Sequence, residues 1–109
     1  MPVDASVDDF HALVSEGSVL VDFWGPRCQP CLALMPAVEA LEDRLAGQLK
    51  LVKVNASENR AICRELSVFG LPTYILLQDG REIERLTGDP KRDEIESAVT
   101  RLLGEGGAA

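Results

Sequence analysis

The chain has 109 residues, of which 46% are hydrophobic and 27% are charged, a composition typical of a globular protein. Its 18 acidic residues outnumber its 11 basic residues, so the formal net charge at pH 7 is −7. This charge disfavours binding to nucleic acid or to an anionic membrane surface, because both attract clustered Lys and Arg. We therefore expect neither as a partner.

The length fits a single domain, 1–109, in which the Gly-rich segment 104–109 is expected to be a flexible tail. No apolar run approaches the roughly 20 residues that a membrane helix needs. The first residues, MPVDASVDDF, are acidic and lack the basic and apolar regions of a signal peptide. We therefore expect a cytoplasmic protein, in which a close cysteine pair is more often catalytic or metal-binding than structural.

The first predicted elements are a helix and a buried strand. Ser6 and Asp9 resemble a capping box ahead of a helix that ends at Gly17. The segment 18–24, SVLVDFW, is short, nearly continuously apolar and rich in β-branched residues. This pattern predicts a central strand that is covered on both faces.

A longer helix is predicted after the cysteines of FWGPRCQPC (23–31), and Gly47 ends it. Pro36 lies inside this helix and is expected to bend it, because proline has no N–H and its ring clashes with the preceding turn. The apolar residues at helical spacing are Leu34, Val38, Leu41 and Leu45.

The later elements, in chain order, are a strand over 49–55, a short helix capped by Ser57, strands over 73–78 and 81–87, and a last helix. Asp79 and Gly80 between the last two strands predict a hairpin turn. Asp89 and Pro90 are a suitable cap and first-turn residue for the last helix. Strands that alternate with helices favour parallel pairing, and the hairpin adds antiparallel strands. The order therefore predicts an α/β fold with a central mixed β-sheet flanked by helices on both faces.

Cys28 and Cys31 lie where a strand ends and a helix begins. The unpaired N–H groups and partial positive charge of a helix N-terminus favour a thiolate, and Arg27 adds a full positive charge. Pro30 is tolerated in a first turn, and the two residues between the cysteines allow the sulfurs to form a small disulfide ring. We expect Cys28 to be the exposed nucleophile and Cys31 the resolving thiol.

A metal site is the alternative use of these thiols. A zinc site of four ligands within this chain has only His11 and Cys63 to complete it. We expect His11 to face solvent and Cys63 to fill the core as a small hydrophobe. The sequence therefore predicts no metal within one chain, whereas a metal shared between two chains is left open.

Asp22 is an acid inside a strand that is expected to be buried. An ionised, unpaired carboxylate there is unfavourable, so Asp22 should be paired or protonated. Lys53 is its candidate partner, because neighbouring parallel strands can bring the two together. Asp22 either pairs at the strand edge without a chemical role or relays a proton to and from Cys31. Its place on the strand that leads to the cysteine loop favours the relay.

Taken together, these residues resemble the thioredoxin family from about Ser6 to Leu103. Pro36 matches the helix-bending proline of the family, Lys53 matches the lysine near its buried acid, and GLPT (70–73) matches the loop whose proline is cis. Within VLVDFWGPRCQPC (19–31), the residues at matching places are Asp22, Phe23, Trp24, Cys28, Pro30 and Cys31.

The resemblance implies a thioredoxin fold and a protein-disulfide reductase that cycles Cys28 and Cys31 between dithiol and disulfide without a bound cofactor. It also implies that Asp22 relays protons, with Lys53 as its partner. The implied partners are protein disulfides and thioredoxin reductase, an NADPH-dependent flavoenzyme, and we expect a monomer. The implied substrate-binding residues are Trp24, Arg27, Gln29, Pro30, Gly70, Leu71, Pro72 and Gly88.

The chain departs from the family pattern at and around the cysteines. Arg27 replaces a tryptophan, Gln29 replaces a glycine, and Leu32 replaces a basic residue. We expect these residues to set the redox poise and the choice of partner. The alternatives are a dedicated electron donor to one partner, such as a peroxiredoxin or methionine sulfoxide reductase, or a non-catalytic interaction module. The buried acid behind the thiols disfavours the module.

Overall fold

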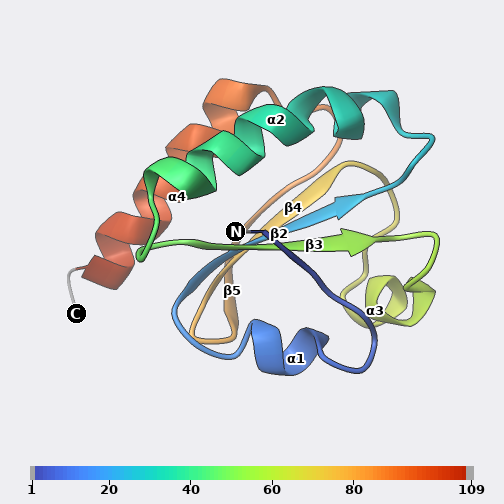
Figure 1. The fold of residues 1–109 in the computed structure, drawn as a ribbon, viewed down its shortest axis with the longest axis horizontal. Coiled ribbons are helices and arrows are strands. Elements are labelled where there is room, and N and C mark those ends of the chain that lie inside the picture. The colour runs from blue at the N-terminus through green and yellow to red at the C-terminus, as the bar shows by residue number, and fades with distance from the viewer. Residues whose placement is uncertain (1, 108–109) are drawn as a thin grey trace.

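A computed structural model describes residues 2–107. Its five strands form one mixed sheet in the order β1-β3-β2-β4-β5 (Figure 1). β1, β3 and β2 run parallel, whereas β2, β4 and β5 pair antiparallel, as the order of elements predicted. The strands are β1 (Val3–Asp4), β2 (Ser18–Trp24), β3 (Lys50–Asn55), β4 (Thr73–Gln78) and β5 (Arg81–Leu86).

The described residues form four helices, two on each face of the sheet (Figure 1). α1 (Phe10–Leu13) and α3 (Arg60–Glu65) cover one face, and α2 (Gln29–Arg44) and α4 (Arg92–Gly107) cover the other. Successive side chains of a strand point to opposite faces. Val19 and Val21 of β2 therefore pack with α1 and α3, whereas Leu20 packs with α2 and α4. Burial on both faces explains the continuous apolar run of β2 and confirms the predicted fold class.

The turn between β4 and β5 confirms the predicted hairpin. Asp79 and Gly80 both have positive φ, 52° and 82°, as a two-residue hairpin turn requires. Asp79 Oδ1 also accepts a hydrogen bond from the N–H of Gly17 at 2.8 Å, which ties the hairpin to the end of the α1–β2 connection. That hydrogen bond lowers the pKa of Asp79.

Several element ends differ from the predictions. α1 ends at Leu13, before Gly17, and its N-cap residue is Asp9, whose Oδ1 accepts a hydrogen bond from the N–H of Ser6 at 2.7 Å. β1 was not predicted, because two residues carry no readable alternation. α3 has Asn59 as its N-cap, while the Ser57 hydroxyl donates to Asn55 Oδ1 at 2.7 Å.

The last helix also begins and ends elsewhere than predicted. It starts at Arg92, so Asp89 and Pro90 precede it, and the Lys91 N–H donates to Glu94 Oε1 at 2.8 Å in a capping interaction. The segment predicted as a tail, 104–109, is helical as far as Gly107, and residues 108 and 109 lie outside the described part. None of the helices within residues 2–107 has the length and apolar character needed to cross a bilayer.

Candidate active site

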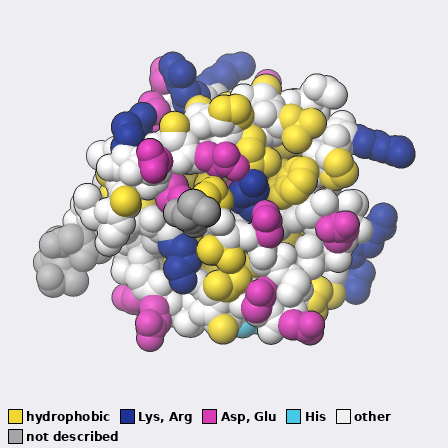
Figure 2. All heavy atoms as spheres, viewed as in Figure 1, with side chains coloured by type: hydrophobic (Ala, Val, Ile, Leu, Met, Phe, Trp, Pro, Cys, Tyr) yellow, Lys and Arg dark blue, Asp and Glu magenta, His cyan; other side chains and the backbone are white. Residues whose placement is uncertain are grey.

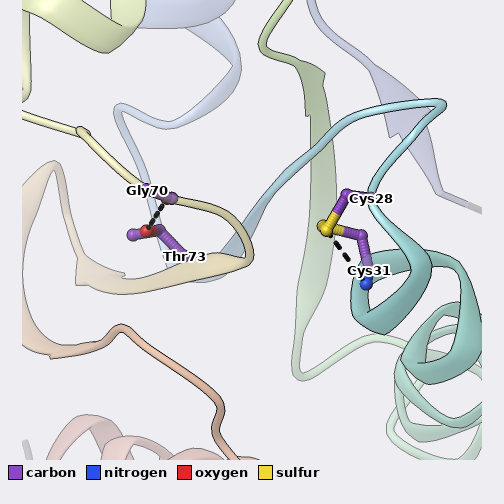
Figure 3. The surroundings of a disulfide bond; sticks show 4 residues. All are labelled: Cys28, Cys31, Gly70 and Thr73. Carbon is purple, nitrogen blue, oxygen red and sulfur yellow. Dashed lines mark hydrogen bonds between the residues drawn. A yellow bond between two sulfur atoms is a disulfide. The ribbon is translucent and has the colours of Figure 1, made fainter.

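Cys28 and Cys31 form a disulfide at the start of α2 (Figure 3). Cys28 is the N-cap residue of the helix, and its Sγ accepts a hydrogen bond from the Cys31 N–H at 3.2 Å. Pro30 stands in the first turn, where its missing N–H leaves no helical bond unmade. Cys28 is partly exposed, whereas Cys31 is fully buried. One sulfur thus faces solvent at the positive end of the helix, and the other lies behind it.

Asp22 lies on the face of β2 that α2 and α4 cover, the same face as Leu20. It is fully buried, and neither of its carboxylate oxygens has a hydrogen-bond partner among residues 2–107. Burial raises the pKa of Asp22 to about 7, with Lys53 lowering it and Glu39 raising it. A carboxyl group with this pKa can both accept and donate a proton near neutral pH.

Lys53 stands opposite Asp22 on the neighbouring strand, as predicted. Its Nζ, however, forms an ion pair with Glu39 Oε2 of α2 at 2.9 Å and lies 4.0 Å from Asp4 Oδ1. The predicted direct pairing with Asp22 is therefore corrected to a longer-range electrostatic one. The physical reason is that Glu39 is half-exposed, so an ion pair with it removes less charge from water than a pair with the buried Asp22.

The Lys53 ammonium stays charged beside the buried acid. Burial lowers the pKa of Lys53, but the hydrogen bond to Glu39 and the charges of Glu39, Asp4 and Asp22 outweigh it, so this pKa is raised. The ammonium also lies 6.0 Å from the centre of the Trp24 ring, within range of a cation–π contact. Trp24 is half-buried next to this charge, at the end of β2.

A hollow of about 570 Å³ adjoins Cys28. Gly25 forms part of its wall, and a Cβ at Gly25 would lie only 3.1 Å from Leu71 Cδ1. A side chain at this position would press against Leu71, so the glycine lets the loop before α2 approach Leu71 closely. Hydrophobic side chains gather on the surface around the point where β2 ends and α2 begins (Figure 2). The residues that line the hollow are Gly25, Pro26, Arg27, Cys28, Ser57 and Leu71.

The loop before β4 forms the other side of the site. The peptide bond between Leu71 and Pro72 is cis, as the resemblance implied. The Thr73 hydroxyl donates a hydrogen bond to the Gly70 carbonyl at 2.7 Å and closes this loop upon itself (Figure 3). Leu71 is thereby held beside the loop that carries Cys28.

The structure brings together only some of the predicted substrate residues. Arg27 and Leu71 line the hollow with Cys28. The predicted residues outside its lining are Trp24, Gln29, Pro30, Gly70, Pro72 and Gly88. Of the residues that do line it, the sequence predictions missed Gly25, Pro26 and Ser57. The first two were detectable as a Gly-Pro pair just before the cysteines, whereas Ser57 reaches the site only through the β3–α3 connection.

The third cysteine and the single histidine are not among the residues that line the hollow at Cys28. Cys63 is buried in the core cluster under α3, as predicted, and burial raises its thiol pKa. His11 is exposed, and its Nε2 lies 2.9 Å from Glu65 Oε2. Within residues 2–107, no three His, Cys, Asp or Glu side chains are grouped so that they could hold a metal ion.

The sequence matches the profile of the Thioredoxin family over residues 2–101. It is 35% identical over 101 residues to thioredoxin of Bacillus subtilis, covering 93% of this chain and 97% of that protein. It is 37% identical over 107 residues to thioredoxin 1 of Synechococcus elongatus, covering 94% and 100%. A solved structure of a mutant thioredoxin from Halobacterium salinarum superposes with a TM-score of 0.84 at 27% identity, covering 94% and 90%. The chain belongs to the thioredoxin family, and it is a thiol–disulfide oxidoreductase with the thioredoxin fold that reduces protein disulfides.

Proposed function

We propose that Cys28 is the nucleophile and Cys31 the resolving thiol in the reduction of protein disulfides. The observation that carries this assignment is the difference in exposure within the pair. Cys28 is partly exposed at the N-cap of α2 and borders the hollow, whereas Cys31 is fully buried. A protein disulfide can approach only the first of these sulfurs, and the helix N-terminus stabilises its thiolate.

The reaction is two successive thiol–disulfide exchanges. The Cys28 thiolate attacks one sulfur of the substrate disulfide, that bond breaks, and the released substrate thiolate takes up a proton. The Cys31 thiolate then attacks Cys28 Sγ, which releases the second substrate thiolate. The substrate gains two electrons as a dithiol, and the chain loses two as the Cys28–Cys31 disulfide.

We assign the proton transfer at Cys31 to Asp22. Its burial, its lack of a hydrogen-bond partner among the described residues and its pKa of about 7 support a carboxylate that accepts the Cys31 proton as that thiol attacks. Lys53 is a positioning residue in this assignment, since it acts on Asp22 through its charge. The pair of Lys53 with Glu39 holds that charge in place.

The substrate segment is proposed to lie across the loop of Leu71 and the hollow beside Cys28. Leu71 and Arg27 line this hollow, which supports their role in substrate contact. The other proposed contacts with the substrate segment are Trp24, Gln29, Pro30, Gly70, Pro72 and Gly88.

We further propose that the disulfide is reduced by a thioredoxin reductase, an NADPH-dependent flavoenzyme, and that the protein acts as a cytoplasmic monomer in one domain. The protein requires an external reductant because each turnover leaves Cys28 and Cys31 oxidised. Turnover with purified reductase and NADPH would support this donor, and light scattering would give the oligomeric state. If only another electron donor reduced the Cys28–Cys31 disulfide, the proposal of a thioredoxin reductase as donor would be contradicted.

The reduction of insulin with dithiothreitol as electron source tests the assignment. We expect Cys28→Ser to abolish catalysis and Cys31→Ser to stop after one exchange, leaving a mixed disulfide with the substrate. Cys63→Ala is the control for the loss of a thiol, because Cys63 takes no part in the disulfide and does not line the hollow at Cys28. Activity that survives Cys28→Ser would overturn the assignment. The proteins captured by Cys31→Ser from a cell extract would separate a general reductase from a donor dedicated to one partner.

A further inference from the structure

A second hollow, of about 300 Å³, lies beside the one at Cys28. Ser57 and Leu71 line both, so the two form a continuous surface. Phe69 lines the second hollow and is 89% exposed, more than any other large hydrophobic residue of the described chain. An exposed aromatic side chain next to a hollow is typical of a binding surface, because it gains most from being covered.

The charge around the two hollows differs from that of the chain as a whole. Arg27 lines the first and Arg60 lines the second, and neither forms an ion pair or hydrogen bond with any described residue. Arg44, Arg85 and Arg101 are paired with glutamates, whereas Arg64, Arg81 and Arg92 resemble Arg27 and Arg60 in having no ion pair with a described residue. The chain has 18 acidic residues, yet no described Asp or Glu lines either hollow.

The view in Figure 2 agrees with this distribution. Basic side chains stand at its right-hand edge, where the β2–α2 loop and α3 lie in Figure 1, beside the hydrophobic patch. The remaining face carries acidic side chains together with further basic ones along its top and in its centre. A protein with a net charge of −7 repels acidic partners in general, so an acidic segment needs a locally basic surface such as the one beside these hollows.

We propose that the two hollows form one groove that selects partner proteins whose disulfide is flanked by an apolar side chain and a carboxylate. This inference rests on the proposed function, because it places the partner disulfide at Cys28. The apolar side chain packs against Phe69 in the second hollow, and the carboxylate pairs with Arg60. Since the hollows share two residues, an extended segment of a few residues that reaches Cys28 also reaches Phe69.

Three synthetic peptides test the proposal. Each contains the same small disulfide loop, flanked on both sides by Leu-Glu, by Leu-Lys or by Gly-Ser. Chemically reduced protein is mixed with each peptide, and the rate of peptide reduction is followed by acid quenching and chromatography. The neutral reagent 2-hydroxyethyl disulfide, too small to reach Phe69, reports the basal reactivity of Cys28 in every variant.

We expect the protein to reduce the Leu-Glu peptide about fivefold faster than the Leu-Lys peptide at low salt. A difference of this size is the effect expected from one partly exposed ion pair. Arg60→Glu should abolish or invert this preference. Arg64→Glu, the same charge change on the same helix but outside the hollow, should retain it. Phe69→Ala should lower the rate of reduction of both Leu peptides about tenfold, because one well-packed apolar contact is lost. The rate for the Gly-Ser peptide should stay the same.

Equal rates for the Leu-Glu and Leu-Lys peptides, or a preference that survives Arg60→Glu, would overturn the proposal. The proposal would also be overturned if Phe69→Ala reduced all three peptides at the rates of the unsubstituted protein. Self-association of the protein through this face, detected by light scattering, would overturn it as well. Binding of fluorescent peptides with serines in place of the cysteines, measured by anisotropy, does not depend on reduction. If no disulfide is reduced, the proposed function fails, and the order of peptide affinities still decides the inference.

Discussion

Lys53 forms an ion pair with Glu39, with 2.9 Å between Nζ and Oε2, and not with the buried Asp22 that stands opposite it on β2. Asp22 has no hydrogen-bond partner among the described residues, and its burial raises its pKa to about 7. The Lys53 charge lowers this pKa and the Glu39 charge raises it. Burial is therefore the main cause of the raised pKa of Asp22, and the charges of Lys53 and then Glu39 adjust it without a hydrogen bond to the carboxyl group.

The first prediction concerns Glu39→Gln. The substitution removes a negative charge and releases Lys53 to act more strongly on Asp22, so the pKa of Asp22 should fall below its value of about 7. Carboxyl carbon chemical shifts of the oxidised protein, followed against pH, measure it. Glu96→Gln is the control, because Glu96 pairs with Arg44. An Asp22 pKa that stays the same or rises would contradict the role of Glu39.

The second prediction concerns stability and pH. Asp22 has a pKa of about 7 in the folded protein, above its ordinary value of 3.8. The folded state therefore binds more protons than the unfolded state between these values, so this group lowers stability as the pH rises through them. Asp22→Asn does not titrate. Its stability relative to the unsubstituted protein should therefore increase between pH 5 and pH 8.5 by at most about 3 kcal/mol.

Urea unfolding of both oxidised proteins at the two pH values measures this difference. A constant gap between Asp22→Asn and the unsubstituted protein would show that Asp22 ionises in the folded state as easily as in the unfolded chain. If the difference in free energy of unfolding widened toward acid pH instead, the pH dependence would have the opposite sign, and burial would be refuted as the cause.

The third prediction concerns Arg27, which stands next to Cys28 and lines the same hollow. Its positive charge favours the thiolate, so Arg27→Ala should raise the pKa of the Cys28 thiol in the reduced protein. The ultraviolet absorbance of the thiolate, followed against pH, measures the change. Arg81→Ala is the control, because Arg81 begins β5 at the opposite end of the sheet from Cys28. An unchanged or lower pKa after Arg27→Ala would contradict the prediction.

The fourth prediction contrasts two glycines. Gly80 has a φ of +82° in the hairpin turn, a conformation that costs an alanine about 1–2 kcal/mol, so Gly80→Ala should destabilise the protein. Gly104 lies within α4, where a Cβ would meet no atom within 4 Å, so Gly104→Ala should stabilise the protein by up to about 1 kcal/mol. Thermal unfolding of both variants measures the two effects. Changes of the same sign would show that backbone conformation is not the cause.

The sequence by itself determined the features that depend on neighbouring residues. The apolar run 18–24 predicted the central strand, and the turn at Asp79 and Gly80 predicted the hairpin. Cys28 and Cys31 were placed at a helix N-terminus because a strand, a loop and a helical repeat follow one another there. Each of these patterns is local, since it depends on backbone propensity and on periodicity within a few residues.

Only the tertiary structure decided which distant side chains meet. Lys53 pairs with Glu39 because α2 packs on the face of the sheet to which β3 contributes, and no spacing in the sequence indicates that contact. Ser57 and Leu71 join the hollow at Cys28 because the β3–α3 connection and the loop before β4 end at the same edge of the sheet. The exposure of Phe69 likewise depends on how α3 packs and on what remains uncovered beside it. Burial and long-range charge, unlike periodicity, are properties of the assembled chain.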